Sequence, residues 1–274
     1  MLPAMKHTIT AGGTQFACES MGAGPGVLFL HAGVADRRSW ALVQDSIASE
    51  FQSHAYDRRG FGETRCTEEP HSHVNDLLAI QDALDPQPTI LVGNSQGGRI
   101  AIDFALAHPD RVQALVLVAP AVSGAPSEST IPAATAKLAA QIESADEAGD
   151  LDRVNELEAH FWLDGSESES GRVGELARSL FLEMNGRALV ADPVGEEVEA
   201  PSAMERMGQL AMPVHLMLGG RDLEQITRRG HWIAEQVQEG SVTLFEGAAH
   251  LPQMEDPSAF SQELLGFLRG LPPR

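Results

Sequence analysis

Residues 89–102 constrain the fold more than any other part of the chain. Residues 90–92 are all apolar, which predicts a strand buried on both faces, and residues 99–107 have the apolar spacing of a helix. The pattern G-x-S-x-G, formed by Gly93, Ser95 and Gly97, lies between them. A buried strand that passes through a tight turn into a helix is typical of a parallel α/β fold.

The turn around Ser95 also predicts chemistry. A turn sharp enough to lift the serine hydroxyl out of the sheet leaves no room for a Cβ at Gly93 or Gly97, and it holds the serine backbone in a sparsely populated conformation. The following helix then begins beneath the hydroxyl, so the N–H of Gln96 points at any oxyanion formed there. Ser95 is therefore a candidate nucleophile, and a plain glycine-rich turn is the alternative.

The remaining pattern predicts one α/β unit with an insertion. Strands alternate with helices up to residue 122 and again from residue 213, which indicates a mostly parallel, eight-stranded twisted sheet with helices on both faces. Two strands at 6–10 and 15–21 predict an antiparallel hairpin at its edge. Residues 123–212 show only helical patterns, so we expect core regions at 1–122 and 213–274 and a helical insertion between them.

Composition excludes several partners. The formal charge is −20, and no Lys/Arg cluster offers a surface for phosphates, so we expect no nucleic acid. Cys18 and Cys66 are too few for a disulfide framework. No stretch has the roughly 18 apolar residues of a membrane span, and the N-terminus lacks the apolar core of a signal peptide. These features predict a cytoplasmic protein that does not bind membranes.

Two further side chains follow predicted strands. A serine hydroxyl needs a neighbouring base, usually histidine, and a carboxylate that orients the histidine. Asp222 follows the strand predicted at 214–219, and His250 ends a loop of small residues after the strand at 242–245. Alone, Asp222 could be a helix N-cap and His250 a hydrogen-bonding loop residue. In the order serine, aspartate, histidine, at the carboxyl ends of strands, they predict a catalytic triad.

Five segments together resemble the α/β-hydrolase superfamily. The resemblance implies Ser95 as nucleophile, Asp222 as acid, His250 as base and the helical insertion as a lid over the site. It also implies an oxyanion hole formed by the N–H groups of Gln96 and Gly33. Because Ala32 replaces the usual glycine of that loop, Val34 is the alternative donor. The segments that carry the resemblance are residues 31–33, 57–62, 93–98, 220–222 and 247–252.

The identity of the nucleophile narrows the reaction. Members of this superfamily that open epoxides or remove halides use aspartate at the position of Ser95, so serine implies an acyl-enzyme and hydrolysis of a carboxylic ester or lactone. We expect a small-molecule carbonyl substrate, no cofactor, no metal, and a monomer or homodimer. The alternatives are hydrolysis of a C–C bond in diketone-type substrates and a ligand-binding protein on a hydrolase fold.

The insertion supplies the candidates for substrate contact. Phe161 and Trp162 are the candidates for substrate contact, although packing of the lid onto the core is the commoner role of such aromatic residues. A carboxylate-binding pocket would favour C–C hydrolysis, with Arg153, Arg172, Arg178 and Arg187 as its candidate cations. The pair His71 and His73 has no third ligand nearby, so we interpret it as two solvated histidines. The turn at residues 57–60 is interpreted as structural.

Overall fold

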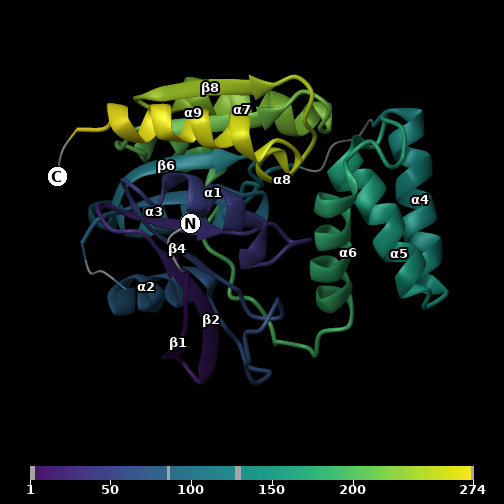
Figure 1. The fold of residues 1–274 in the computed structure, drawn as a ribbon, viewed down its shortest axis with the longest axis horizontal. Helices are drawn as coiled ribbons and strands as arrows, with labels where there is room; N and C mark the ends of the chain where they lie inside the picture. Colours follow the sequence, from purple (N-terminus) through teal and green to yellow (C-terminus); the bar gives the residue numbers. More distant parts are fainter. Residues whose placement is uncertain (1–3, 85–86, 127–130, 273–274) are drawn as a thin grey trace.

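The computed structural model describes residues 4–84, 87–126 and 131–272. Its centre is an eight-stranded sheet in the order β1-β2-β4-β3-β5-β6-β7-β8 (Figure 1). The first two pairings, β1 with β2 and β2 with β4, are antiparallel, and the others are parallel. The predicted sheet is therefore confirmed. The strands are β1 (Met5–Ala11), β2 (Thr14–Met21), β3 (Gly26–Leu30), β4 (Gln52–Tyr56), β5 (Thr89–Asn94), β6 (Val112–Val118), β7 (Val214–Gly219) and β8 (Gly240–Phe245).

Helices cover both faces of the sheet. On one face α2, α3 and α7 pack against the strands, and on the other face α1 and α9 lie together. Short 3₁₀ turns complete the connections around them. The elements of the body are η1 (Arg37–Trp40), α1 (Ala41–Ile47), α2 (His73–Leu84), α3 (Gln96–Ala107), η2 (Pro109–Arg111), α7 (Glu224–Gln236), α8 (Pro252–Glu255) and α9 (Pro257–Gly270).

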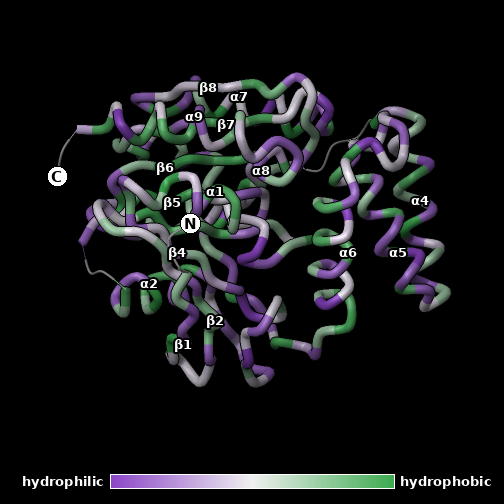
Figure 2. The backbone as a smooth tube through the Cα atoms, viewed as in Figure 1, coloured by the Kyte–Doolittle hydropathy of each residue, from purple (hydrophilic) through white to green (hydrophobic). Residues whose placement is uncertain are grey.

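Alternation along the strands explains the two layers. In β3, Val27 and Phe29 belong to the core shared with α1 and α9, whereas Leu28 and Leu30 belong to the core shared with α2 and α3. Successive strand side chains point to opposite faces, so an all-apolar strand fills both cores at once. Figure 2 shows this as hydrophobic colour along the central strands. The carboxyl ends of these strands thus belong to a rigid, doubly covered sheet.

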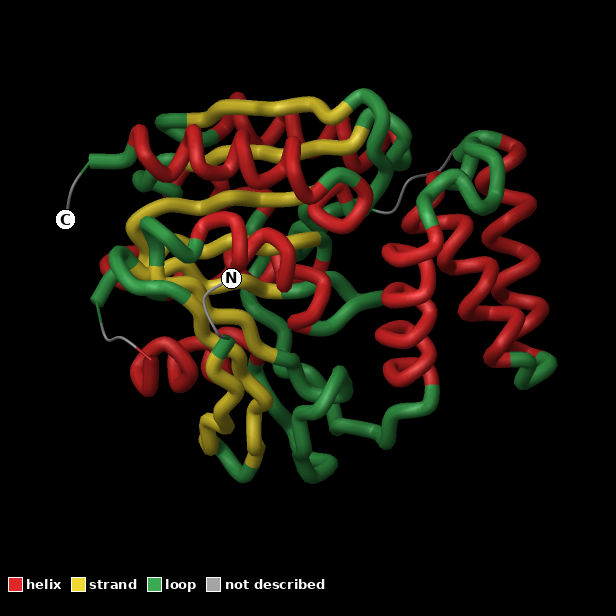
Figure 3. Tube along the Cα trace, in the orientation of Figure 1, coloured by secondary structure: helices red, strands yellow, loops and turns green. Residues whose placement is uncertain are grey.

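Between β6 and β7 the described residues form helices and no named strand (Figure 3). We call residues 123–212 the helical insertion. Its outer helices pack through a small core of their own that includes Leu138, Val154 and Leu157, and α6 lies between them and the body (Figure 1). The elements are α4 (Ala133–Glu147), α5 (Leu151–Glu158), a π-helical segment η3 (Ala159–Gly165), α6 (Glu175–Leu189) and η4 (Met204–Gln209).

Candidate active site

Ser95 occupies the turn between β5 and α3 with φ 54° and ψ −114°. This left-handed conformation is strained for any residue with a Cβ, so the surrounding packing must enforce it. The neighbouring glycines show how: a Cβ at Gly93 would collide with the carbonyl of Gly97, and a Cβ at Gly97 would collide with the carbonyl of Leu30. The side chain of Ser95 does not cap the helix, and the residue stays partly exposed.

Asp222 and His250 meet at the same edge of the sheet. The Oδ2 atom of Asp222 lies 2.7 Å from Nδ1 of His250, and both side chains are 3% exposed. The histidine loop reaches this position because Gly219 has no Cβ where the carbonyl of Ala249 crosses the end of β7. A carboxylate on Nδ1 fixes the tautomer that leaves Nε2 free to accept a proton. The structure thus pairs the predicted base with the predicted acid.

Asn94 joins the serine turn to the histidine loop. Its Nδ2 atom donates to the carbonyls of Val118, at 3.0 Å, and His250, at 3.2 Å, while its Oδ1 accepts from Nε2 of Gln253 at 3.0 Å. Sequence analysis missed this role because an asparagine beside the serine carries no signal of a distant partner. A fully buried amide with these partners holds the loops of Ser95 and His250 at a fixed separation.

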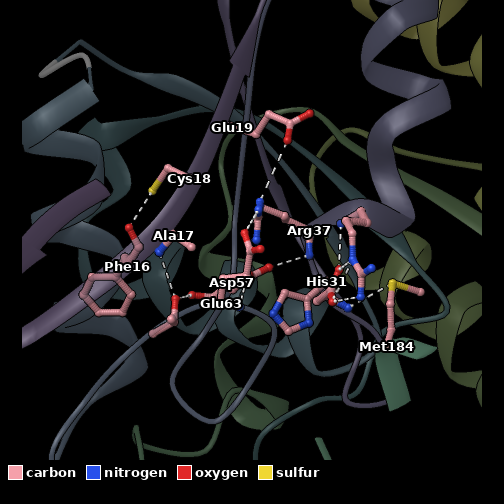
Figure 4. A network of polar contacts seen from close by, with 12 residues as sticks. Phe16, Ala17, Cys18, Glu19, His31, Arg37, Asp57, Glu63 and Met184 are labelled. Atoms are coloured by element: carbon pink, nitrogen blue, oxygen red, sulfur yellow. Dashed lines mark hydrogen bonds and ion pairs between the residues drawn. The ribbon is translucent and has the colours of Figure 1, made fainter. Parts of the chain in front are cut away.

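The candidate oxyanion donors lie on the loop after β3 and at the start of α3. Among the described residues, the backbone N–H groups of Gly33, Val34 and Gln96 have no hydrogen-bond partner. The C-terminal end of this loop is anchored by two contacts. The N–H of Asp36 donates to Sδ of Met184 in the insertion at 3.4 Å, and Arg37 pairs with Asp57 in the body (Figure 4). Free N–H groups on a fixed loop are what an oxyanion hole requires.

Trp162 lies against the candidate base. Its ring is 4.6 Å from that of His250, centroid to centroid, and its carbonyl accepts the backbone N–H of His250 at 3.2 Å. Phe161 contacts Trp162 at 4.6 Å, and both line a mainly apolar cavity of about 470 Å³ between α4, α5 and the end of α6. The π-helical turn of η3 places the two aromatic rings side by side. Trp162 therefore lies between this cavity and the candidate base.

The arginines of the insertion have structural partners. Arg172 pairs with Glu255 and donates to the carbonyl of Gly247 at 2.8 Å, which ties the insertion to the histidine loop. Arg178 pairs with Asp164 at 2.7 Å, and Arg187 with Glu183 at 2.9 Å. Arg153 is exposed on α5. Three of the four candidate cations are thus neutralised by carboxylates.

The interpretation of His71 and His73 as solvated was wrong. His71 is buried, its ring lies 5.0 Å from that of His73, and the side chain of His73 is 11% exposed. Burial, with the charge of Arg58 nearby, lowers the pKa of His73 to about 2. The polar sequence around the pair hid the fact that residues 69–71 form backbone hydrogen bonds with residues 194–198 of the insertion. Within the described ranges, no group of three His, Cys, Asp or Glu side chains is arranged to hold a metal ion.

These features define a class of protein. An eight-stranded sheet of this order, a strained serine after β5, and an Asp–His pair after β7 and β8 are the features of an α/β hydrolase. A family model described as "alpha/beta hydrolase fold" matches residues 25–153. The chain thus has the α/β-hydrolase fold.

Individual relatives are similar over most of their length. A pimeloyl-(acyl-carrier protein) methyl ester esterase of Chromobacterium violaceum is 29% identical over 250 residues, which cover 91% of this chain and 96% of that protein. A 2-hydroxy-6-oxononadienedioate/2-hydroxy-6-oxononatrienedioate hydrolase of Cupriavidus pinatubonensis is 26% identical over 278 residues, covering 95% and 93%.

A solved structure shows the same fold. The esterase RhEst1 from Rhodococcus sp. ECU1013 superimposes with a TM-score of 0.78 at 22% identity, covering 98% of this chain and 99% of that one. None of the helices that the structure describes in this chain has the length and hydropathy of a membrane span.

Proposed function

We propose that the protein is a cofactor-independent serine hydrolase that cleaves a carboxylic ester or lactone through an acyl-enzyme on Ser95. The observation that carries this proposal is the contact of 2.7 Å between Asp222 and His250 at the sheet edge where Ser95 lies in its strained turn. The similarity to an esterase over 91% of the chain supports ester hydrolysis as the class of reaction.

In the proposed mechanism, the hydroxyl of Ser95 attacks the substrate carbonyl while Nε2 of His250 takes the hydroxyl proton. Asp222 keeps the proton on Nδ1 and stabilises the imidazolium that forms. The N–H groups of Gln96 and the loop after β3 hold the oxyanion. The leaving alcohol takes the proton from His250, and a water molecule, deprotonated by His250, then hydrolyses the acyl-enzyme and regenerates Ser95.

The cavity beside Trp162 indicates which substrates fit. Its lining is mainly apolar, and the polar groups there, Glu143, Asp146 and Glu158, are acidic. Burial raises the pKa of Glu158, although Asn185 donates a hydrogen bond to it. An anionic group would meet these carboxylates without a compensating cation, whereas an uncharged alkyl or aryl group would bury apolar surface. We therefore propose an ester or lactone with an uncharged, apolar acyl or alcohol part.

Hydrolysis of a C–C bond is the second candidate, because the relative from Cupriavidus pinatubonensis is named as a hydrolase of 2-hydroxy-6-oxo compounds, which are enol forms of the diketone-type substrates expected for that reaction. Its substrate, by name, is a dioate and carries carboxylates. Here Arg172, Arg178 and Arg187 are paired with acidic side chains. A carboxylate-bearing substrate would have to break one of these pairs or bind the exposed Arg153, which favours the ester.

The test is hydrolysis of p-nitrophenyl esters with short and medium acyl chains, beside acyl homoserine lactones and a carboxylated diketone. We expect turnover of the uncharged esters or lactones, and a loss of about 10⁴-fold or more in Ser95→Ala. If only the diketone is turned over, C–C bond hydrolysis would replace ester hydrolysis as the proposed reaction. Binding of these compounds without turnover, or unchanged turnover in Ser95→Ala, would contradict the proposed mechanism.

A further inference from the structure

The peptide between Ala32 and Gly33 is held from its carbonyl side. The Ala32 oxygen lies 2.7 Å from Nδ1 of His31 and accepts Nη2 of Arg58 at 3.2 Å. The backbone N–H of Arg58 donates to Nε2 of His31 at 3.0 Å, so Nε2 is unprotonated and Nδ1 carries the proton that it donates to Ala32. Burial and the nearby charge of Arg58 lower the pKa of His31 well below its ordinary value, so the ring stays neutral.

The direction of the Gly33 N–H follows from these two donors. The structure contains no cis peptide bond among the described residues, and in a planar trans peptide the N–H points away from the carbonyl. Fixing the Ala32 oxygen therefore fixes the Gly33 N–H on the opposite side, where it has no described partner. Donors on the carbonyl also polarise the peptide, which makes its N–H a stronger donor.

Arg58 differs from the other buried arginines. Arg37 and Arg59 both pair with carboxylates, whereas no ion pair is recorded for Arg58 within the described part of the chain. Its guanidinium lies over Phe61 at 4.5 Å, its Nε atom has no partner, and burial lowers its pKa to about 10. An unpaired buried cation is costly, so its position calls for a functional explanation.

The remaining Arg58 contact reaches the other candidate donor. Its Nη1 atom donates to Oε1 of Gln96 at 3.2 Å. The Gln96 carboxamide packs against Gly33, because a Cβ on Gly33 would lie only 2.9 Å from Cδ of Gln96. The Arg58 guanidinium therefore contacts both candidate donors indirectly. It binds the carbonyl of the Ala32–Gly33 peptide and the side chain of Gln96. It also adds a positive charge behind both.

We propose that Arg58 is a positioning residue of the oxyanion hole, and that it orients Gly33, rather than Val34, as the donor from the loop after β3. This inference rests on the proposed function of the site. Arg58 favours the tetrahedral intermediate over the bound ester, because charge on the substrate oxygen develops only after attack.

The experiment compares Arg58→Lys and Arg58→Gln with the matched variants Arg59→Lys and Arg59→Gln. For Arg58→Gln we expect kcat for a p-nitrophenyl ester to fall about 10-fold to 100-fold with KM changed less than about threefold. Arg58→Lys keeps the positive charge but loses the two separate N–H donors of the guanidinium, so its kcat should lie between those of the wild type and Arg58→Gln. The Arg59 variants should lower the melting temperature and leave kcat within about threefold, because Arg59 braces α2 through Asp76.

A trifluoromethyl ketone adds a readout that general destabilisation would not move. Its adduct on Ser95 carries the oxyanion, so its Ki should rise in parallel with the loss of kcat/KM, while the Ki of the neutral alcohol product stays constant. Folded Arg58→Gln with unchanged kcat and unchanged ketone Ki would overturn the proposal.

Two controls separate the possible failures. If neither Arg58 variant folds, Gln96→Ala at an exposed position removes the second contact, and unchanged kcat and ketone Ki there would overturn the proposal as well. Wild-type turnover and ketone inhibition test the proposed function itself, so failure of the Arg58 inference is distinguishable from failure of the serine mechanism.

Discussion

The body and the helical insertion contribute to the site in different ways. In the body, Ser95, His250 and the loop after β3 are held by buried polar contacts, such as Asn94 on the carbonyl of His250 at 3.2 Å. The insertion meets the body through apolar packing of Phe181, Met184 and neighbouring side chains, and through ion pairs such as the one between Arg172 and Glu255. Among the candidate site residues, Trp162 is the one from the insertion that touches a member of the Asp–His pair.

Charge separates the two regions further. The insertion holds six Lys and Arg residues against eighteen Asp and Glu residues, in a chain whose formal charge is −20. Its buried acid, Asp164, is neutralised inside the insertion by Arg178. Under the proposed function, the body performs the chemistry and the insertion supplies contacts to the substrate. Substitutions in the body should therefore change kcat, and those in the insertion should change KM.

The largest effect is expected for Asp222→Asn. Loss of the carboxylate leaves His250 in the wrong tautomer, and kcat should fall by about 10⁴-fold. Asp164→Asn is the matched variant in the insertion, because both aspartates are buried and paired. It should lower the free energy of unfolding by about 3 kcal/mol and leave kcat within a few-fold. Equal losses of kcat in the two variants would remove the distinction between body and insertion.

Next in size is a pH effect on the stability of the body. The pKa of His73 is lowered from 6.5 to about 2 in the folded state, so below pH 6.5 the unfolded chain binds a proton that the folded chain does not. The free energy of unfolding therefore decreases as the pH is lowered, and His73 alone accounts for a decrease of about 2 kcal/mol at pH 5. In urea unfolding, the free energy of unfolding of His73→Gln should decrease by about 2 kcal/mol less than that of the wild type between pH 7 and pH 5. His231→Gln, at an exposed position, is the control and should follow the wild type.

Trp162→Leu should act on binding. Removal of the indole takes away the wall between the apolar cavity and His250, so KM for a medium-chain ester should rise about 10-fold, with a smaller change in kcat. Trp232→Leu on α7 is the matched control and should leave KM unchanged. A drop in kcat that exceeds the rise in KM would place Trp162 with the chemical groups of the body.

The smallest effect is expected for Arg153→Gln. This side chain is exposed on α5 and makes no recorded ion pair among the described residues, so kcat and KM for uncharged esters should stay within about twofold. Assays with a neutral ester and its carboxylated analogue check this. A selective loss for the carboxylated analogue would identify Arg153 as a substrate cation and revive the C–C hydrolase alternative.

The sequence predicted the centre of the sheet because β3, β5, β6 and β7 are short, mainly apolar runs. It placed Ser95, Asp222 and His250 after β5, β7 and β8, since strand ends of a parallel sheet share one edge. Just before α1 (Ala41–Ile47) the chain forms the 3₁₀ turn η1, because the side chain of Asp36 caps that turn by accepting the N–H of Arg38.

Contacts between distant segments were beyond the sequence. The interpretation of residues 57–60 as structural holds for Arg59, which pairs with Asp76, but the contacts of Arg58 with Ala32 and Gln96 depend on how three loops meet. The partners of Arg172, Arg178 and Arg187 could not be predicted either, because helical periodicity does not say which acid a long side chain reaches. The π-helical turn that directs Trp162 at His250 has no sequence signature.

The central claim is that Ser95 is an activated nucleophile, and covalent labelling tests it most directly. The folded protein is incubated with a fluorophosphonate, and intact-mass measurement and peptide mapping locate the adduct. The account predicts one adduct per chain, on Ser95, which is absent in Ser95→Ala and forms far more slowly in Asp222→Asn. No adduct on the folded protein, or an adduct that persists in Ser95→Ala, would contradict it.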